Sequence, residues 1–570
     1  MLRKLVIAAL AAGALAAPVA AQPTAPTTLM PGVTYTRQVQ FTPRGPVVLD
    51  VVTAPRPDGT LYALAPAVAH NALSSTETLT GIEKDASATE TSVGVNGDFF
   101  ASNHGPPTGI VMANGALTSA PISTRSSVGI APNGALTVAQ VSFDGTWRGT
   151  GQRRQLDLND PPVSGHTTLY TPAWGAATPP ENGVVEDVIQ TLPPLLPNHV
   201  LTGTVVQQNG AGGTPIPPGG AVLVSRGAQA PHLSAEAPVG TTVEIRPTLT
   251  PDWSTQLAAI GGGPVLVSGG KAVFRANEAF DDAVLNARSA RSAVGQLRNG
   301  QILLVTVEGG GSDYSAGMTN YELAEAMVKL GAVTAMGLGS GTPAGMAFDG
   351  TLLTRPSTKT EQPIADALLL SYTGVYAAPP SSDVVSPNGD GVDDSETFTY
   401  KLVSPSQVSA TLTGPGGAQM TLAQDAEQPG LHTLAWNGQP ATEGLWRFVV
   451  TGTDAQNRTT TAERDVLLDN TLGNLAVTPS GHLAASSKVT VIATFNLSHS
   501  ANVTATIETR TGVVVDTLVS KTLQPGAQAI PWNGRIWTGG LAFTGAYQVH
   551  VVASNSIGTT ELIAPFVARR

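Results

Sequence analysis

The stretch Gln301-Ile-Leu-Leu-Val-Thr-Val-Glu-Gly-Gly310 decides how the long N-terminal part of the chain is organised. Its run of apolar and β-branched residues, bounded by turn residues, is typical of a buried strand. The strand ends at Glu308, and the two glycines after it indicate a tight turn. A carboxylate at the end of a buried strand is well placed to act as an acid/base catalyst. The alternative is a solvated acid in an ordinary turn.

Downstream of this strand lies the clearest helix signal in the chain, over residues 319–330. Thr319 is a suitable N-cap, Glu322 follows at the spacing of a capping box, and Gly331 ends the helix. The apolar side chains that share one face are Leu323, Met327 and Leu330. We therefore expect this helix to pack against a sheet.

Upstream, Ser92-Val-Gly-Val95 reads as another buried strand, and it runs into the polar turn Asn96-Gly-Asp-Phe-Phe100. Asp98 precedes two aromatic residues, so it is a candidate catalytic or sugar-contacting acid; plain turn chemistry is the alternative. Asn96 should hydrogen-bond to neighbouring backbone whether or not it also touches a ligand. A strand over residues 47–52 and a helix over residues 74–86 complete the coarse prediction.

The composition bounds the protein class. A length of 570 residues is too long for one hydrophobic core and predicts several domains. The high glycine and proline content, with only 12% charged residues, favours many strands joined by tight turns. The formal net charge of −11 gives no general attraction to nucleic acid. The absence of cysteine excludes disulfides, thiolate catalysis and cysteine zinc sites.

The N-terminus has the pattern of a secretory signal peptide. Met1-Leu-Arg-Lys4 carries two positive charges, an apolar run follows to Val19, and small residues precede the expected cleavage after Ala21. The alternative, a membrane anchor, is disfavoured because the run is alanine-rich and short for a span. Residues 22–32 read as a disordered lead-in. We therefore expect a secreted, periplasmic or cell-surface protein.

The C-terminal third repeats itself. Trp436-Asn-Gly438 and Trp532-Asn-Gly534 lie 96 residues apart, and each is followed by an alternating strand. This pattern predicts two β-sandwich modules, residues 383–470 and 471–570, after a linker at 377–382. The modules resemble the Ig-like domain of flagellar hook-capping proteins. We expect them to space the N-terminal domain or attach it to a cell surface.

The first module opens with Ser386-Pro-Asn-Gly-Asp-Gly-Val-Asp-Asp394. Oxygen ligands from Asn388, Asp390 and Asp394, with Gly391 at the bend, would suit Ca²⁺. The loop departs from an EF-hand, because Ser386 holds the first position and no glutamate closes it. The alternative is an acidic turn without an ion.

Several blocks between residues 30 and 376 together resemble the phosphodiester glycosidase family. The blocks, in the order of that family, are Val95–Phe100, Gly105–Gly115, Ala259–Gly269, Arg291–Gly295, Tyr314–Thr319 and Glu361–Leu368. The resemblance implies hydrolysis of the bond between an anomeric carbon and phosphate, with no cofactor required. It implies a glycan or glycosyl-phosphate substrate from a cell envelope or extracellular polysaccharide.

The resemblance also implies which residues bind substrate. Arg291 is the cationic candidate for the phosphodiester, with a surface charge as the alternative. The further binding candidates are Asn96, Tyr314, Ser315, Thr319, Gly339, Gly341 and Glu361. The catalytic candidates are Glu308 and Asp98.

Two departures from the family pattern lie in these blocks. The family's Asp-Gly-Arg is here Glu308-Gly-Gly310, so the acid persists and the arginine is lost. The family's Asn-x-Asp is here Gly337-Leu-Gly339, so a carboxylate is missing. A catalytically inactive binding or adhesion protein is therefore the alternative function. If the rest of the site survives, Gly339→Asp should raise activity.

The sequence thus predicts an α+β glycosidase-like domain over residues 33–376, followed by two all-β Ig-like sandwiches. A proline- and glycine-rich segment, residues 176–220, reads as an insertion within the large domain and not as a separate core.

Overall fold

The computed structural model describes residues 22–23, 25–100, 105–161, 163, 165–274, 276–311, 313–439, 441–478, 482–484 and 491–569. The chain divides after Tyr372 into two compact units. The predicted signal peptide, residues 1–21, lies outside the described residues. Among the helices that are described, none is long and apolar enough to cross a membrane.

The predicted α+β class is wrong, because the protein is nearly all β, with 52% of it in strands and 7% in helices. The helix signals at residues 74–86 and 319–330 mark short helices, and the chain between them forms sheets. The described helical segments are α1 (Leu79–Ser87), α2 (Ala230–Glu236), α3 (Asp282–Asn286), α4 (Asn320–Lys329), η1 (Ala69–Asn71), η2 (Gly227–Gln229) and η3 (Pro415–Gly417). Helix α1 begins later than predicted because the side chain of Thr78 caps it, accepting the Gly81 N–H at 3.1 Å.

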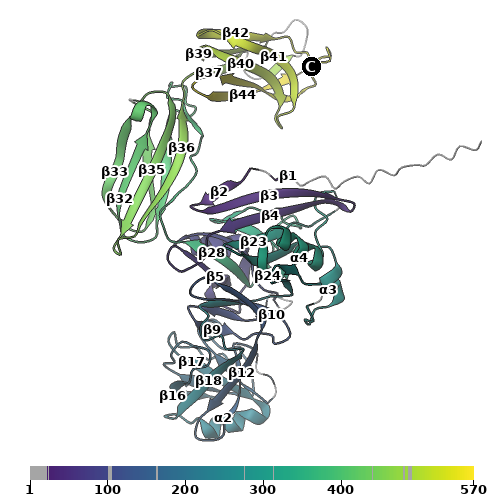
Figure 1. Cartoon of the computed structure of the whole chain (residues 1–570), viewed down its shortest axis with the longest axis vertical. Coiled ribbons are helices and arrows are strands. Elements are labelled where there is room, and N and C mark those ends of the chain that lie inside the picture. Colours follow the sequence, from purple (N-terminus) through teal and green to yellow (C-terminus); the bar gives the residue numbers. More distant parts are fainter. Residues whose placement is uncertain are drawn as a thin grey trace, which may run out of the picture. The chain divides into compact units, whose positions relative to one another are not determined.

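A large sheet, here called the main sheet, organises the first unit (Figure 1). Its strands in spatial order are β1 (Gln22–Pro23), β3 (Val33–Thr42), β4 (Gly45–Ala54), β23 (Ile302–Val307), β22 (Arg291–Leu297), β24 (Ala332–Ser340), β20 (Val265–Ser268) and β21 (Lys271–Ala272), with β2 (Thr27–Met30) beside β3. Strand β2 buries Leu29 and Met30. The prediction that residues 22–32 are disordered is therefore wrong for residues 27–30.

Helix α4 covers one face of the main sheet, as predicted. The Thr319 side chain accepts the Glu322 N–H at 3.2 Å, and Glu322 accepts the Thr319 N–H at 2.8 Å, which is the predicted capping box. Leu323 and Met327 are fully buried, and they share one hydrophobic cluster with odd-numbered residues of β4 and β23, while α4 itself lies over β20, β21 and β24. Because side chains alternate along a strand, the even-numbered residues of β4 and β23 face the other side of the sheet.

Two smaller sheets complete this part of the unit. The second sheet runs β26 (Thr351–Leu352), β25 (Met346–Phe348), β7 (Thr91–Asn96), β28 (Asp366–Tyr372) and β5 (Tyr62–Val68). The third sheet runs β11 (Leu136–Gln140), β10 (Ser126–Ile130), β19 (Ala258–Gly261), β8 (Val111–Ala113) and β9 (Ala116–Ser119). The short strands β6 (Glu77–Thr78) and β27 (Pro363–Ile364) pair with each other, and α1 packs on the second sheet through Leu79 and Ile82.

The predicted insertion at residues 176–220 belongs to a closed barrel that extends well beyond it in both directions. The barrel strands in order are β12 (Ser142–Arg148), β13 (Arg154–Leu158), β14 (Thr167–Tyr170), β17 (Ala221–Arg226), β15 (Val184–Ile189), β16 (Leu201–Asn209) and β18 (Thr242–Thr250). Trp147, Leu223 and Ile245 belong to its core, which is continuous with Ile110 and Met112 beside the third sheet. The barrel therefore has a hydrophobic core, and this core is continuous with the core beside the third sheet.

The second unit consists of two β-sandwiches with the same strand order, which confirms the internal repeat. In the first, β29 (Tyr376–Ala377), β31 (Glu396–Leu402) and β34 (Gly430–Trp436) face β30 (Val384–Val385), β36 (Thr459–Leu468), β35 (Gly444–Asp454), β32 (Ser406–Thr413) and β33 (Gln419–Glu427). In the second, β37 (Leu472–Thr478), β39 (Val491–Leu497) and β42 (Gly526–Trp532) face β38 (His482–Ala484), β44 (Thr559–Arg569), β43 (Gly545–Ser554), β40 (Ala501–Thr509) and β41 (Val514–Leu523). The tryptophans of the repeat, Trp436 and Trp532, are buried in the two cores.

The predicted linker at residues 377–382 is part of the first sandwich. Ala377 lies in β29 and pairs with Tyr400, and the Ser381 backbone and side chain both donate to Glu396. The boundary between the units therefore lies at Tyr372, before the predicted position.

The end of β24 approaches the end of β7 very closely at Gly339. The Gly339 N–H donates to the Gly97 carbonyl at 2.8 Å. A Cβ atom at this position would lie 2.9 Å from the Asp98 carbonyl oxygen and 2.9 Å from the Asn96 amide nitrogen. Glycine at 339 is therefore the condition for this contact, and the structure leaves no room for the aspartate of the family pattern.

We predict that Gly339→Ala lowers the free energy of unfolding by about 1–3 kcal/mol, because overpacking forces the backbone of Asp98 to shift. Gly339→Asp should destabilise at least as much. Thermal unfolding followed by circular dichroism measures the change. Gly210→Ala is the control, because open space surrounds Gly210. Equal melting temperatures for Gly339→Ala and Gly210→Ala would refute the close contact.

A second prediction concerns Asp187 in β15. Burial raises its pKa from the usual 3.8 to about 7, although Gln208 donates to it at 2.8 Å. Between these pH values the unfolded chain has released the proton and the folded chain still holds it, so stability falls as pH rises. Asp187→Asn should therefore gain stability relative to the natural protein at pH 8 more than at pH 5. A melting-temperature difference that is the same at both values would contradict this.

Candidate active site

A row of polar side chains crosses the main sheet on the face opposite α4. Neighbouring strands place Arg37 beside Asp50, Asp50 beside Thr306, and Thr306 beside Ser292 in direct register. Asp50, Thr306 and Ser292 are buried. Asn96, at the end of β7, reaches this row and accepts a hydrogen bond from the Ser292 hydroxyl at 2.5 Å.

Glu308 lies two residues beyond Thr306 and so on the same face, at the end of β23. Its side chain is completely buried. One carboxylate oxygen accepts from the Arg37 guanidinium at 2.8 Å and from the Arg355 N–H at 2.6 Å. The predicted catalytic acid therefore lies inside a charged, hydrogen-bonded cluster and is not a solvated turn acid.

Tyr314 joins the same cluster. Its hydroxyl donates to the second carboxylate oxygen of Glu308 at 2.5 Å, and it also accepts from Arg37. Burial, and secondly the hydrogen bond to Glu308, raise the pKa of Tyr314 to about 12. Ser315 supports the arrangement from behind, because its hydroxyl donates to the Glu308 carbonyl at 2.5 Å and accepts the Val48 N–H at 3.1 Å.

Asp50 adds a second carboxyl group to the cluster. Its Oδ1 atom accepts from the Tyr35 hydroxyl at 2.6 Å and lies 3.7 Å from Arg37, while no hydrogen-bond partner for Oδ2 is found among the described residues. Burial, and to a smaller extent the nearby charge of Glu308, raise the pKa of Asp50 to about 7 against the lowering effects of Tyr35 and Arg37. Asp50 can therefore hold its proton near neutral pH.

A cavity of about 450 Å³ opens beside this cluster. Its lining residues are Gly309, Gly310, Tyr314, Arg355, Pro356, Ser357, Thr358 and Lys359. The Arg355 guanidinium lies 4.3 Å above the centre of the Tyr314 ring. The lining thus offers two cationic side chains, hydroxyls and no carboxylate, which suits an anionic ligand.

Asp98, the other predicted catalytic acid, has different surroundings. Its carboxylate accepts the Phe99 N–H at 2.7 Å, and burial raises its pKa to about 6 although the charge of Arg125 lowers it. Asp366 accepts the Asp98 N–H at 2.9 Å, and burial together with the charge of Asp98 raises the pKa of Asp366 well above its usual range. Within the described residues, neither hydrogen bond nor ion pair joins Asp98 to Glu308.

The predicted binding residues Asn96 and Gly339 lie together and hold strand ends in place. The Asn96 amide donates to the Gly339 carbonyl at 3.0 Å and accepts the Gly345 N–H at 3.2 Å. Asn96 is buried, and these two hydrogen bonds to backbone groups are the kind that the sequence predicts for it. Gly341 has a φ of +89° with open space around it, and its N–H donates to the Ala290 carbonyl.

Arg291 is buried and bound to backbone, so it is neither a surface charge nor directed toward the cavity. Its guanidinium donates to the carbonyls of Met318, Val284 and Ala287 at 2.6–2.7 Å and to the Asn320 side chain at 3.1 Å. Burial lowers the pKa of Arg291 to about 10. This residue fastens the segment before β22 to the start of α4.

Thr319 and Glu361 each stabilise a helix N-terminus. Thr319 caps α4. The carboxylate of Glu361 accepts the Thr80 N–H at 2.9 Å and the Thr80 hydroxyl at 2.6 Å in the first turn of α1. The Thr319 hydroxyl and the Glu361 carboxylate, which were predicted to bind substrate, are therefore already engaged in hydrogen bonds within the protein.

In the second unit, the predicted calcium ligands form local turn contacts. The Asp394 carboxylate accepts the N–H groups of Gly389 and Gly391 at 2.7 and 2.8 Å. Asn388 accepts the Asp390 N–H at 3.0 Å, and Asp390 accepts the Val392 N–H at 2.9 Å. The calcium site stays a prediction.

Sequence reasoning missed Arg37, Asp50 and Arg355. Asp50 had a signal, because it is the one charged residue inside the apolar run of residues 47–52. Arg37 and Arg355 had none, since their roles arise only when β3 and the segment after β26 are brought beside the end of β23.

Comparison with known proteins supports the family resemblance. The sequence model of the phosphodiester glycosidase family matches residues 198–371. This segment contains Glu308, Tyr314 and Arg355, whereas Arg37 and Asp50 precede it. No curated protein matches the chain.

Solved structures give further matches. A hypothetical protein from Synechocystis is 28% identical, with a TM-score of 0.50, over 60% of this chain and 62% of its own length. A protein from Burkholderia pseudomallei K96243 is 24% identical, with a TM-score of 0.47, over 57% of this chain and 74% of its own length. A third match is the catalytic domain of zebrafish N-acetylglucosamine-1-phosphodiester alpha-N-acetylglucosaminidase, auto-inhibited by its pro-peptide. It is 13% identical, with a TM-score of 0.34, over 62% of this chain and 88% of its own length. The chain thus spans less than two thirds of the Synechocystis protein. The resemblance predicted from the sequence blocks is confirmed, and residues 198–371 match the phosphodiester glycosidase family.

Proposed function

We propose that the protein hydrolyses sugar-1-phosphodiesters at the bond between the anomeric carbon and phosphate. The observation that carries this proposal is the cationic cavity that opens directly beside the Glu308–Tyr314 pair. A phosphodiester is an anion, and the reaction at its anomeric carbon needs a nucleophile and a base. Both requirements meet at this one place in the main sheet.

The phosphate group lies against Arg355 and Lys359 in this proposal. An arginine guanidinium presents paired N–H donors to phosphate oxygens, and a lysine adds a mobile positive charge. The family's arginine after the strand is replaced by Gly310, and Arg355 supplies a guanidinium to the same cavity from another segment.

Tyr314 is the group that contacts the substrate directly in this proposal, because Tyr314 lines the cavity and the Glu308 side chain is completely buried. The Tyr314 oxygen attacks the anomeric carbon, the carbon–oxygen bond to phosphate breaks, and the phosphate monoester leaves. The phenol proton passes to Glu308. Water then attacks the same carbon, the tyrosine oxygen takes the proton back from Glu308, and the proton of the water is released to solvent. Tyrosine nucleophiles of this kind are known among glycosidases.

Arg37 and Asp50 position the reacting pair. Arg37 donates to both Glu308 and Tyr314, so it holds the carboxylate and the phenol together. Protonated Asp50 leaves the charge of Arg37 available to Glu308. In the part of the chain that the structure describes, no hydrogen bond or ion pair joins Asp98 to Glu308, which favours Glu308 over Asp98 as the base.

A second candidate function is binding of a glycosyl phosphate without turnover. The closed contact at Gly339 favours it, because the carboxylate of the family pattern has no replacement at that position. Both candidates use the same cavity, and only one of them consumes the substrate.

We also propose that the protein acts outside the cytoplasm. The N-terminal sequence supports export, so the substrates would be envelope or extracellular glycans. The two sandwiches would attach the protein to a cell surface as Ig-like modules, and the loop 386–394 would take up Ca²⁺ to stiffen the start of the first sandwich.

We predict that Glu308→Gln and Tyr314→Phe each lower kcat/KM by about 100-fold or more, because the first removes the base and the second removes the nucleophile. The assay follows release of phosphate monoester from a panel of sugar-1-phosphodiesters. Glu325→Gln, on the exposed side of α4, is the matched control and should leave the rate unchanged.

Three other outcomes would have distinct meanings. Unchanged turnover in both Glu308→Gln and Tyr314→Phe would contradict the assignment of the site. Loss of turnover in Asp98→Asn alone would move the base to Asp98. Saturable binding of the substrate with no turnover in the natural protein would establish the second candidate.

We also predict that activity falls as pH rises through about 7. Asp50 loses its proton in this range, and the new negative charge competes for Arg37 and repels the phosphate. Asp50→Asn resembles the protonated form, so its alkaline limb should be flatter. Profiles of kcat/KM from pH 5 to pH 9 test this, and identical profiles for the two proteins would exclude the role of Asp50.

A further inference from the structure

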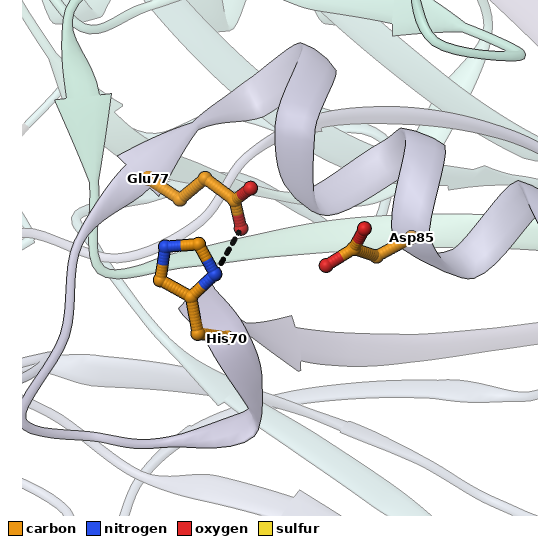
Figure 2. A group of neighbouring side chains, drawn as sticks. All are labelled: His70, Glu77 and Asp85. Atoms are coloured by element: carbon orange, nitrogen blue, oxygen red, sulfur yellow. Dashed lines mark ion pairs between the residues drawn. The ribbon is translucent and has the colours of Figure 1, made fainter.

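Three side chains that the proposed reaction does not use converge near the start of α1 (Figure 2). His70 comes from η1 after β5, Glu77 from β6, and Asp85 from α1. One ligand atom from each lies within 4.8 Å of the other two. Figure 2 shows the carboxylates of Glu77 and Asp85 directed toward the ring of His70. An imidazole nitrogen with two carboxylate oxygens is a donor set for a divalent transition metal.

The Glu77 carboxylate carries the strongest sign that a cation belongs here. Its Oε2 atom is closed off from solvent and has no hydrogen-bond partner among the described residues. The same atom lies 3.4 Å from the Nδ1 atom of His70, which makes a long ion pair only when the imidazole is protonated. A buried carboxylate oxygen without a donor is costly, and a metal ion would satisfy it.

The helix is shaped to receive this carboxylate. A Cβ atom on Gly81 would lie only 2.4 Å from the other Glu77 oxygen and 2.7 Å from its carbon atoms. Glycine within a helix is unfavourable relative to alanine. Its presence in the first turn of α1 therefore makes the space in which Glu77 lies.

The three ligands are also held by independent supports. Strand β6 is fixed by its pairing with β27, where Glu77 lies opposite Ile364. Helix α1 is fixed by the cap from Thr78 and by the contact of Glu361 with Thr80. Such support keeps the ligands of a metal site in place before the ion arrives.

We propose that His70, Glu77 and Asp85 form a divalent-metal site, with Zn²⁺ as the ion that this mixed donor set binds well. One imidazole nitrogen and two carboxylate oxygens supply three ligands, and water completes the coordination. The His70 side chain is 57% exposed, so the site is open to solvent on that side. The bound ion would fasten η1, β6 and α1 to one another.

The test is titration of the full chain with Zn²⁺ by calorimetry, supported by the visible absorption of Co²⁺ at the same site. The natural protein should bind one ion at this site. His70→Ala, Glu77→Gln and Asp85→Asn should each weaken that binding by about tenfold or more. His166→Ala is the matched control, because His166 also pairs with an aspartate, Asp157, at 2.9 Å, and no third ligand group joins them among the described residues.

A readout of stability guards against misfolded variants. Asp85 is exposed, so Asp85→Asn should keep the fold by circular dichroism. Zn²⁺ should raise the melting temperature of the natural protein and of His166→Ala, but not that of Asp85→Asn. Absence of Zn²⁺ binding in the natural protein, or equal affinities in the natural protein and all three ligand variants, would overturn the proposal and leave an ordinary His70–Glu77 ion pair.

Discussion

The shared use of one guanidinium by two buried carboxyl groups is the constraint on which the site depends. Arg37 lies within ion-pair distance of both Glu308 and Asp50. Two buried carboxyl groups facing one cation are costly to ionise together, and burial raises the pKa of Asp50 to about 7. This arrangement leaves Glu308 able to accept a proton from Tyr314, and it ties the middles of β3 and β4 to the end of β23.

The main sheet separates its two tasks by face. Apolar odd-numbered residues of β4 and β23 belong to the same hydrophobic cluster as α4, and the even-numbered polar residues form the row that ends at the cavity. The second sheet reaches this row through Asn96, and that contact requires glycine at position 339. The close packing of these strand ends therefore excludes an aspartate at position 339. In the proposed reaction, catalysis rests on Glu308 and its partners.

Local signals predicted part of this structure well. The capping box and apolar face of α4, the strand ending at Glu308, and the tryptophan repeat were all readable, because each depends on neighbours in sequence. The α+β class was wrong, and the barrel was not predicted, because residues 176–220 were interpreted only as an insertion. Barrel closure pairs β12 with β18, about a hundred residues apart, and no local pattern encodes such pairing. Arg291 shows the same limit: family resemblance suggested a ligand contact, whereas its surroundings make it a backbone fastener.

The most direct measurement is a crystal structure of the protein with a non-hydrolysable sugar-1-phosphonate. The account predicts the phosphonate oxygens against Arg355 and Lys359, with the anomeric carbon next to the Tyr314 hydroxyl and Glu308 behind it. A phosphonate bound away from this cavity, for example beside Asp98 and Arg125, would contradict the account.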